Sequence, residues 1–499
     1  MLSKVFSPRW TLHRIHKWMG LIAAIWLLVL GLTGFLLDHR DTWRWLWQGG
    51  LSENIITESI VDKSKKGQIK YYQVNPYEPQ QQVAAGLTGL WWTDNSGKNW
   101  FRAQFSSSDT SPMISSILFS GKNELWIASD DGVWLSEDGG QTAIRKLLPE
   151  QWVSALSYDV STNTLMGVVE RTSIFQYSIE KNNLTWLELN AVKESSLPNE
   201  INLSRFTRDI HYGRGVFEIP LSLLWNDISA VAMIVLPLTG FLFYWMPRRW
   251  KYNKQKKISH KYKKQSIRWL FRLHGPTFGL ISMIPILYLS ITGILLDHSD
   301  GLRSWMKSVQ VTRGWQTPVY NLSSWDGEIY GIVSYPNNEN KLSVGTRLGL
   351  FTSLDRGQNW QREKLVSNKS LFIWTLRRHK ENIYIGGMGG PNMVKVKQQD
   401  WHPVKGVGHM PSDITLDENT NWMWKSRHGI KGGRLETGFS HSHIILPTSN
   451  YVPWFYIIDG LHSGALIHPQ WKWVNDFIAV LAVLLVITGL LRWWRKKWI

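Results

Sequence analysis

The sequence contains no cysteine among its 499 residues. Disulfide bonds, cysteine-ligated iron–sulfur clusters and covalent haem attachment through C-x-x-C-H are therefore excluded. Any haem would therefore have to be held by His or Met. The sequence offers 15 His and 12 Met. Candidate redox or metal chemistry has to be sought among these residues.

Acidic residues are scarce relative to basic ones. The chain has 38 Asp and Glu against 56 Lys and Arg, which gives a formal net charge of +18 at pH 7. Such a surplus could indicate nucleic-acid binding, but the basic residues are concentrated beside apolar segments, as membrane proteins require. We therefore expect no nucleic-acid partner.

Long apolar runs are few, and the mean hydropathy of −0.21 indicates that most of the chain lies in water. Four runs stand out, at residues 19–37, 228–246, 278–296 and 477–491. Each approaches the roughly 20 residues that a membrane-spanning helix needs. The sequence therefore predicts four transmembrane helices in contact with membrane lipid, and we expect the first to be an uncleaved anchor.

The distribution of Lys and Arg predicts the topology. They crowd the link between the second and third runs and also follow the fourth run: Arg248, Arg249, Lys251, Lys254, Lys256, Lys257, Lys261, Lys263, Lys264, Arg268, Arg272, Arg492, Arg495, Lys496 and Lys497. Short basic loops remain on the cytoplasmic side. We therefore expect a multi-pass protein of a bacterial inner membrane with cytoplasmic N- and C-termini and two long periplasmic segments.

The expected organisation follows from these runs. It comprises a first span with a cytoplasmic N-terminus (1–39), a first periplasmic segment with its return to the membrane (40–221), a second span (222–247), a basic cytoplasmic link (248–273), a third span (274–298), a second periplasmic segment with its return (299–472), and a fourth span with a basic tail (473–499).

The membrane part is duplicated. Spans one and three share His16, Gly20, Thr33, Gly34, Asp38 and His39 with His274, Gly279, Thr292, Gly293, Asp297 and His298. Spans two and four share His211, Gly213, Asn226, Asp227, Thr239 and Gly240 with His462, Gly464, Asn475, Asp476, Thr488 and Gly489. The chain is thus two copies of one helical hairpin, which predicts a four-helix bundle with a pseudo-twofold axis along the membrane normal. The Thr-Gly pairs are expected to allow close helix packing, and Asn-Asp to cap helices.

The long segments contain a second repeat. Stretches 89–100, 132–142 and 349–360 share one pattern, and strand-like runs separated by turns lie between them. The pattern resembles the Asp-box, S-x-D-x-G-x-[TN]-W, of sialidase-like β-propeller blades, where it is a folding motif. The resemblance implies a periplasmic β-propeller of about six blades, assembled from both long segments. The expected fold class is therefore membrane α plus β.

The duplicated histidines are the strongest functional candidates. His16 and His274 lie at the cytoplasmic ends of spans one and three, His39 and His298 at their periplasmic ends, and His211 and His462 precede spans two and four. Two imidazoles that face each other from different helices are what bis-histidine haem ligation needs. We expect His16 with His274 to hold one haem b and His211 with His462 a second. His39 and His298 remain an alternative pair or a third site.

Other assignments stay open at this point. His13 could replace His16 as a ligand, although an interfacial role is favoured. A bare metal such as zinc could bind the same histidines. No compact His, Asp and Glu cluster crosses the predicted membrane interior, so haem is the better interpretation.

The order of motifs resembles the bacterial PepSY-associated transmembrane family, some members of which are inner-membrane reductases of iron–siderophore complexes. The motifs are His followed by Gly at the start of spans one and three, H-x-G before spans two and four, and Thr-Gly within each span. The resemblance implies that His16, His211, His274 and His462 ligate haem. Unlike that family's pattern, this sequence has no PepSY domain and shows propeller-like repeats instead.

The expected function is therefore that of an oxidoreductase. Electrons from an external donor, either quinol or a cytoplasmic reductase, would cross the membrane through haem b and reduce a ferric siderophore or another periplasmic acceptor. The cytoplasmic segments are too short for a flavin or nicotinamide domain. Two alternatives remain: electron transfer to an acceptor without iron, and a membrane-anchored propeller that senses or binds a partner without redox activity.

Overall fold

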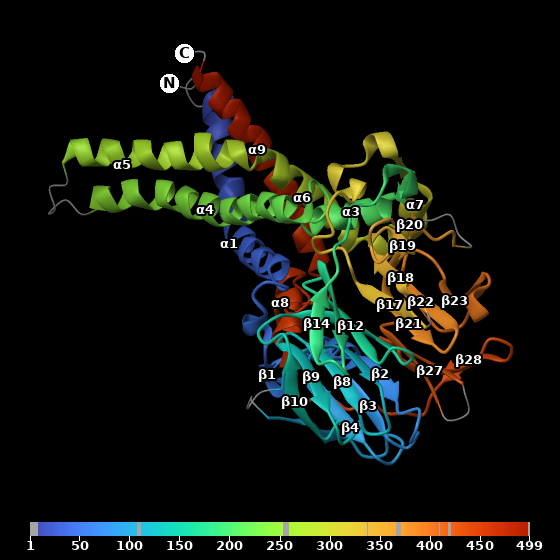
Figure 1. Cartoon of the computed structure of the whole chain (residues 1–499). Coiled ribbons are helices and arrows are strands. Elements are labelled where there is room, and N and C mark those ends of the chain that lie inside the picture. Colours follow the sequence, from blue (N-terminus) through green and yellow to red (C-terminus); the bar gives the residue numbers. More distant parts are fainter. Residues whose placement is uncertain are drawn as a thin grey trace. The chain divides into compact units, whose positions relative to one another are not determined.

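The computed structural model describes residues 8–106, 111–252, 259–336, 338–365, 371–408, 410–417 and 421–497 (Figure 1). Lys254, Lys256 and Lys257 of the basic link lie outside these residues. The chain divides into two compact units. One comprises Met1–Thr42, Leu203–Val309 and Ile457–Ile499, and the other Trp43–Asn202 and Gln310–Tyr456. The first unit is built from helices and the second mainly from β-sheets.

The helices of the first unit follow the predicted hairpins. They are α1 (Pro8–Asp38), α3 (Leu203–His211), α4 (Ile219–Tyr252), α5 (His260–Arg272), the π-helical segment η5 (Leu273–Gly279), α6 (Met283–Asp297), α7 (Ser299–Ser308) and α9 (Lys472–Lys497). A further helix, α8 (Trp454–His462), begins in the second unit and ends in the first.

Within the described residues, three helices are long and apolar enough to cross a membrane: Leu12–Asp38, Ile219–Lys251 and Lys472–Trp494. The remaining predicted run lies in a broken pair, His260–Gly279 and Met283–Asp297, which bends by 58°. The described part of the chain therefore has three such helices, or four if the bent pair forms one span. Exposed apolar side chains, such as Ile25 at 76%, cover the outer helix faces, as contact with lipid requires.

Helix α1 packs against both α4 and α9. Ala23 and Trp26 of α1 lie in one apolar cluster with Ile478 and Leu481 of α9. On the side facing α4, a Cβ atom at Gly31 would lie 2.8 Å from the carbonyl oxygen of Ala230. Glycine at this position therefore allows the two helices to approach closely. In Figure 1, α4 and α5 run side by side.

Six larger sheets follow one another along the described part of the second unit, three from each long segment. Those of the first segment are β2 (Ile69–Val74) to β5 (Phe101–Arg102) with β3 (Gln82–Gly86) and β4 (Gly89–Thr93); β7 (Ile114–Phe119) to β10 (Thr142–Leu147) with β8 (Leu125–Ser129), β9 (Gly132–Ser136) and β6 (Gln104–Phe105); and β11 (Val153–Asp159) to β14 (Asn183–Trp186) with β12 (Thr164–Val169) and β13 (Ser173–Ser178).

The second segment supplies the other three sheets. They are β17 (Gly331–Tyr335) to β20 (Gln361–Arg362) with β18 (Asn338–Thr346) and β19 (Gly349–Ser353); β21 (Phe372–His379) to β24 (Trp401–Val404) with β22 (Asn382–Met388) and β23 (Asn392–Lys395); and β25 (Asp413–Leu416) to β28 (Gly438–His441) with β26 (Trp422–Ser426) and β27 (Gly429–Arg434). Two small sheets pair β1 (Gly50–Ser52) with β29 (Tyr451–Pro453) and β15 (Glu200–Asn202) with β16 (Gln310–Thr312).

Sequential strands in these sheets pair in an antiparallel manner, and only the short β6 pairs in parallel, with β10. The middle strands are apolar and buried, whereas the last strands, such as β5 and β14, are short and largely exposed. Short outer strands limit pairing with other chains. Tight hairpins connect the second and third strands, and Gly132, with a φ of +89°, begins one third strand in a conformation that glycine favours.

The first strands of the six sheets contact one another in sequence, and β25 then contacts β2. At this junction the buried Asp413 carboxylate accepts hydrogen bonds from Tyr72 N at 3.1 Å and Gln73 Nε2 at 2.9 Å. Arg377 Nε of β21 donates to the same carboxylate at 2.8 Å, and its guanidinium also donates to Ser116 Oγ of β7. The Asp413 carboxylate thus joins the last of the six sheets to the first, so that the sheets form a ring.

The three repeated turns share one hydrogen-bonding arrangement. In the second, Ser136 Oγ donates to Asp138, which accepts from the backbone N–H of Thr142. Equivalent bonds join Ser353, Asp355 and Asn359, and join Thr93, Asn95 and Asn99. The hydrogen bonds from Asn359 lower the pKa of the half-buried Asp355 to about 2. The recurring residues therefore stabilise a hairpin turn.

Candidate functional site

Four of the six predicted histidines share one environment, although they come from four different elements. In each, the ring Nδ1 lies within hydrogen-bonding distance of the hydroxyl of a Thr-Gly pair on another helix. The Nδ1···Oγ1 distances are 2.8 Å for His16 and Thr488, 2.8 Å for His274 and Thr239, 3.0 Å for His211 and Thr292, and 2.9 Å for His462 and Thr33. Each span thus receives one imidazole.

The direction of these hydrogen bonds follows from the threonines. Each hydroxyl has one hydrogen, which it donates to the carbonyl oxygen four residues earlier: Val29, Val235, Tyr288 and Leu484, at 2.6–2.7 Å. The hydroxyl oxygen must then accept from the imidazole, so the histidine carries its proton on Nδ1. The lone pair consequently resides on Nε2, which is the nitrogen left to bind a metal.

The glycine of each pair provides room for the ring. A Cβ atom built at Gly34, Gly240, Gly293 or Gly489 would lie 3.4–3.7 Å from Cε1 of the neighbouring histidine. The imidazole therefore rests against the helix at van der Waals distance, and a side chain larger than alanine would push it away. The sequence suggested that the Thr-Gly pairs are helix-packing contacts. In the structure each pair contacts one histidine ring.

The structure brings His16 and His274 together. Their ring centroids are 6.3 Å apart and their planes are nearly perpendicular, at 86°. Two imidazole nitrogens that bind one metal from opposite sides, each at about 2.0–2.1 Å, place the ring centroids roughly 6 to 6.5 Å apart. The centroid separation of this pair is therefore that expected for two imidazoles that bind one metal ion. The ring of Phe243 lies beside that of His274, with 5.9 Å between the ring centroids, and adds apolar surface.

His211 and His462 form the second pair. They lie at the ends of α3 and α8, close enough for their protonated forms to repel each other. Their threonine partners, Thr292 and Thr33, lie on α6 and α1. His16 and Thr33 are both on α1, about 26 Å apart at a rise of about 1.5 Å per residue. The two histidine pairs therefore belong to opposite ends of the spans.

A π-helical turn keeps His274 in register with the first copy. The third span has one more residue between histidine and glycine than the first, since His274 and Gly279 correspond to His16 and Gly20. The π-helix η5, which contains Pro276, spans this stretch. A π-helical turn accommodates one extra residue, and the chain bends by 58° directly after it, before Met283–Asp297. The insertion is thus absorbed beside the histidine itself.

His39 and His298 differ from the other four. His298 Nε2 lies 2.7 Å from Asp476 Oδ2, and His39 Nε2 lies 3.5 Å from Asp227 Oδ2. His39 also uses Nδ1, at 3.0 Å from the carbonyl oxygen of Phe35. Their Nε2 atoms therefore face carboxylates rather than each other.

The prediction that the Asn-Asp pairs cap helices is wrong. Helix α4 begins at Ile219 and helix α9 at Lys472, so both pairs lie inside helices. Asn226 Nδ2 donates to Asp38 Oδ2 and to the carbonyl oxygen of His211, each at 3.2 Å.

The second copy repeats this connection. Asn475 Nδ2 donates to Asp297 Oδ2 at 3.4 Å and to the carbonyl oxygen of Ser463 at 3.1 Å. Each asparagine thus joins a span to the short helix that carries a histidine. The duplication in the sequence singled out these residues but could not name their partners.

Among the residues that the structure describes, no group of three or more His, Cys, Asp and Glu side chains could hold a metal ion. His13, the alternative to His16, is exposed on α1.

The geometry is that of a membrane protein whose helices hold histidine rings against Thr-Gly pairs. A family model described as the PepSY-associated TM region matches residues 13–496. The chain therefore belongs to the PepSY-associated TM family. No curated protein matches the chain significantly.

Several solved structures resemble the chain weakly. They include an ancestral GH74 enzyme (TM-score 0.35, 10% identity, 79% of this chain and 39% of that chain), the extracellular domain of a one-component system from B. thetaiotaomicron (0.36, 10%, 81% and 35%) and PorZ, a component of the type-IX secretion system of Porphyromonas gingivalis (0.34, 8%, 76% and 32%). The chain covers less than two fifths of each of these proteins. TM-scores of this size do not establish a common fold.

Proposed function

We propose that this protein transfers electrons across the bacterial inner membrane through two b-type haems and reduces a ferric complex on the periplasmic side. His16 and His274 would hold one haem, and His211 and His462 the other. The observation that supports this most directly is the fourfold arrangement in which a threonine accepts from Nδ1 and leaves the Nε2 lone pair to the metal. Two such pairs would supply four histidine ligands to iron.

The proposal includes two haems rather than three. His39 and His298 have aspartates as the partners of their Nε2 atoms, so they lack the feature that the other four share. A neutral imidazole with a free Nε2 is the form that ligates iron. We assign these two histidines to the Asp-His contacts that join the spans.

A bound haem would supply a one-electron carrier with its iron in a low-dielectric environment. The residues of the chain hold and orient it. The histidines ligate, the threonines fix the tautomer, the glycines leave room for the rings, and the apolar helix faces exclude water. Partners that orient a ligating histidine are half of such a site's design.

The arrangement of the helices and sheets supports this proposed path of electrons across the membrane. We assign the bent pair of helices as a fourth span, which completes a four-helix unit with one histidine pair toward each membrane face. We assign the ring of six sheets as a six-bladed β-propeller on the periplasmic side. The apolar cluster of Tyr72 and Val74 with Met423 and Ile430 joins the last sheet to the first and supports closure of the ring.

The electron donor and acceptor follow from chemistry. We propose quinol or a soluble reductase as the donor. At the other face one electron converts Fe(III) to Fe(II), which oxygen-rich chelators hold more weakly, and iron is released. The donor is oxidised as the ferric complex is reduced.

Haem quantitation with a reduced-minus-oxidised absorption spectrum of the full-length protein tests the assignment. We expect two b-type haems per chain, with His16→Ala and His462→Ala each losing a different one. His39→Ala and His298→Ala are the matched controls and should retain both. A haem-free wild-type protein, or a loss of haem in His39→Ala as large as in His16→Ala, would reject the assignment.

Reoxidation tests the direction of electron flow. Protein reduced with dithionite and separated from excess reductant should be reoxidised by ferric complexes, with Fe(II) appearing in a ferrozine assay. His462→Ala should abolish this reoxidation while leaving the other haem reducible. If no ferric complex reoxidises the loaded protein, iron reduction is not its function.

A further inference from the structure

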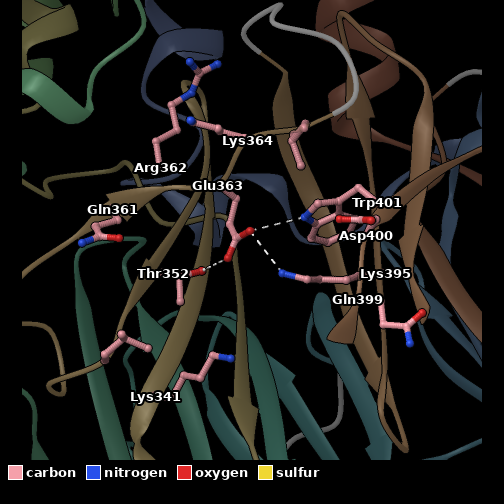
Figure 2. A pocket seen from close by; sticks show the side chains of 12 residues that line it. Lys341, Thr352, Gln361, Arg362, Glu363, Lys364, Lys395, Gln399, Asp400 and Trp401 are labelled. Carbon is pink, nitrogen blue, oxygen red and sulfur yellow. Dashed lines mark hydrogen bonds and ion pairs between the residues drawn. The ribbon is translucent and has the colours of Figure 1, made fainter. Parts of the chain in front are cut away.

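A cavity of about 620 Å³ opens between two neighbouring sheets of the second unit, β17–β20 and β21–β24 (Figure 2). Volumes of roughly 300–1,000 Å³ are typical of sites for small organic ligands. Lys341 and Thr352 come from one sheet, and Lys395 and Trp401 come from the other. The cavity thus brings together residues about 60 positions apart in the sequence.

Glu363 lies at the centre of this cavity. Its Oε1 accepts from Thr352 Oγ1 at 3.1 Å, and its Oε2 lies 3.2 Å from Lys395 Nζ and 3.4 Å from Trp401 Nε1 (Figure 2). The three donors come from both sheets and hold the carboxylate in place. Lys395 in turn is positioned by Glu363, with its side chain 16% exposed.

The cavity is lined mainly by positive charge. Four cationic side chains and two carboxylates line it: Lys341, Arg362, Lys364, Lys395, Glu363 and Asp400. Lys341 is close enough to Lys395 for the two ammonium groups to repel each other. Burial and this repulsion lower the pKa of Lys341, and Glu363 opposes the effect only in part. A ligand with negative charge would offset the repulsion.

An apolar surface accompanies the charge. Trp401 forms one wall with 6% of its surface exposed, Leu365 is also buried, and Leu354 lies at the rim with 64% exposed. Lysine ammonium groups act as point charges and do not impose the planar, two-pronged geometry of an arginine fork. The combination suits an organic anion with carbon surface rather than a bare inorganic ion.

We propose that this cavity binds a small organic polyanion with several carboxylates, held by Lys341 and Lys395 over the Trp401 wall. That the anion is a carboxylate chelate of Fe(III) rests on the proposed function, whereas anion binding itself does not. The site would give the protein a preference for anionic over cationic iron complexes. Its chemistry differs from that of the histidine pairs.

Calorimetric titration of full-length protein with gallium(III) citrate tests this proposal. Gallium(III) resembles ferric iron in charge but is not reduced, so binding is measured independently of electron transfer. Lys341→Gln and Lys395→Gln should each weaken binding at least tenfold. Lys397→Gln, an exposed lysine close in sequence to Lys395 but outside the cavity, is the matched control and should bind as wild type does.

Two further ligands test the selectivity. The gallium complex of a cationic trihydroxamate chelator should bind at least tenfold more weakly than gallium citrate, and inorganic phosphate should not compete at equal concentration. Equal affinity for the two gallium complexes would overturn the proposal, as would unchanged affinity in both lysine variants. Lys341→Gln retains the contact between Lys395 and Glu363, so a misfolded Lys395→Gln would not decide the test.

The outcome is separable from that of the proposed function. If gallium citrate binds and the lysine variants weaken it, the site stands even when ferric citrate fails to reoxidise the reduced protein. If ferric citrate reoxidises the protein but the lysine variants bind gallium citrate as tightly as wild type, electron transfer stands and this site is rejected.

Discussion

At the scale of single residues, the four Thr-Gly pairs explain more of the candidate site than the histidines do alone. A histidine at the end of a span can face lipid, water or a ligand, and its sequence position does not distinguish these. The threonine distinguishes them because it donates its one hydroxyl hydrogen to a carbonyl oxygen of its own helix. Its oxygen can then only accept a hydrogen bond from the histidine. The sequence showed that the pair recurs in every span, but the partner across the helices depends on the fold.

Replacing Thr488 by valine tests the positioning role. Valine keeps the shape and removes the acceptor of the Nδ1 hydrogen bond of His16. We expect the affinity of the haem between His16 and His274 to fall about 10- to 100-fold, as is typical when a residue that orients a metal ligand is removed. Its midpoint potential should also shift, whereas the potential of the other haem should not.

Haem titration into haem-free protein and spectroelectrochemistry measure these two effects. Thr488→Ser, which retains the hydroxyl, should restore both values and serves as the control. Valine and serine variants that agree with the wild type in affinity and potential would leave Thr488 with a packing role only.

At the scale of elements, the apolar runs predicted where spans lie but not where helices begin. Helix α1 begins at Pro8 and α4 at Ile219, well before the runs at 19–37 and 228–246. Apolar length reports the thickness of the hydrocarbon layer, whereas helical hydrogen bonding continues beyond it. The error about the Asn-Asp caps has this origin, because a cap was placed where the apolar run starts.

The repeated turns and strand-like runs were more informative. They predicted sheets from both long segments, since each sheet is a local unit of antiparallel hairpins. The junctions between sheets could not be predicted in this way. Asp413, Tyr72 and Arg377 are far apart in the sequence and meet only through the order of the sheets.

Asp413→Asn tests the junction between the first and last sheets. The buried carboxylate pairs with Arg377 and accepts two further hydrogen bonds from β2. Breaking a buried ion pair on one side costs about 3–5 kcal/mol, because the remaining charge is left without compensation. We expect the apparent melting temperature of the sheets, followed by tryptophan fluorescence, to fall by on the order of 5–10 °C.

An exposed ion pair supplies the control. Glu194, with 82% of its side chain exposed, pairs with Arg313 in the same unit. Exposed pairs contribute roughly 0–1 kcal/mol, so Glu194→Gln should melt within about 2 °C of the wild type. Equal melting temperatures for the two variants would mean that the ring does not depend on Asp413.

At the scale of the whole molecule, duplication made the pairing of histidines predictable. Two copies with the same orientation place equivalent positions at the same membrane face, and His16 and His274 do lie together. The different environment of His39 and His298 could not be predicted. Their aspartate partners are duplicated as well, so all six histidines look equivalent in the repeat. The cavity at Glu363 could not be predicted from the sequence either, because its lining residues come from two different sheets.

Under the proposed function the topology would decide which way electrons move, and fusions with two reporters test it. The basic link and tail predict cytoplasmic ends. Green fluorescent protein fused after residue 499 should fluoresce, and alkaline phosphatase inserted there should be inactive. Fusions after Ser196 or Asn321, in the two long segments, should give the opposite result.

The same fusions bear on the histidine pairs. His16 lies near the start of α1 and Thr33, the partner of His462, toward its other end. If the ends are cytoplasmic, the His16 and His274 pair receives electrons and the His211 and His462 pair delivers them. An active phosphatase after residue 499 would invert this order, so that the sheets would face the cytoplasm and periplasmic iron could not be the acceptor.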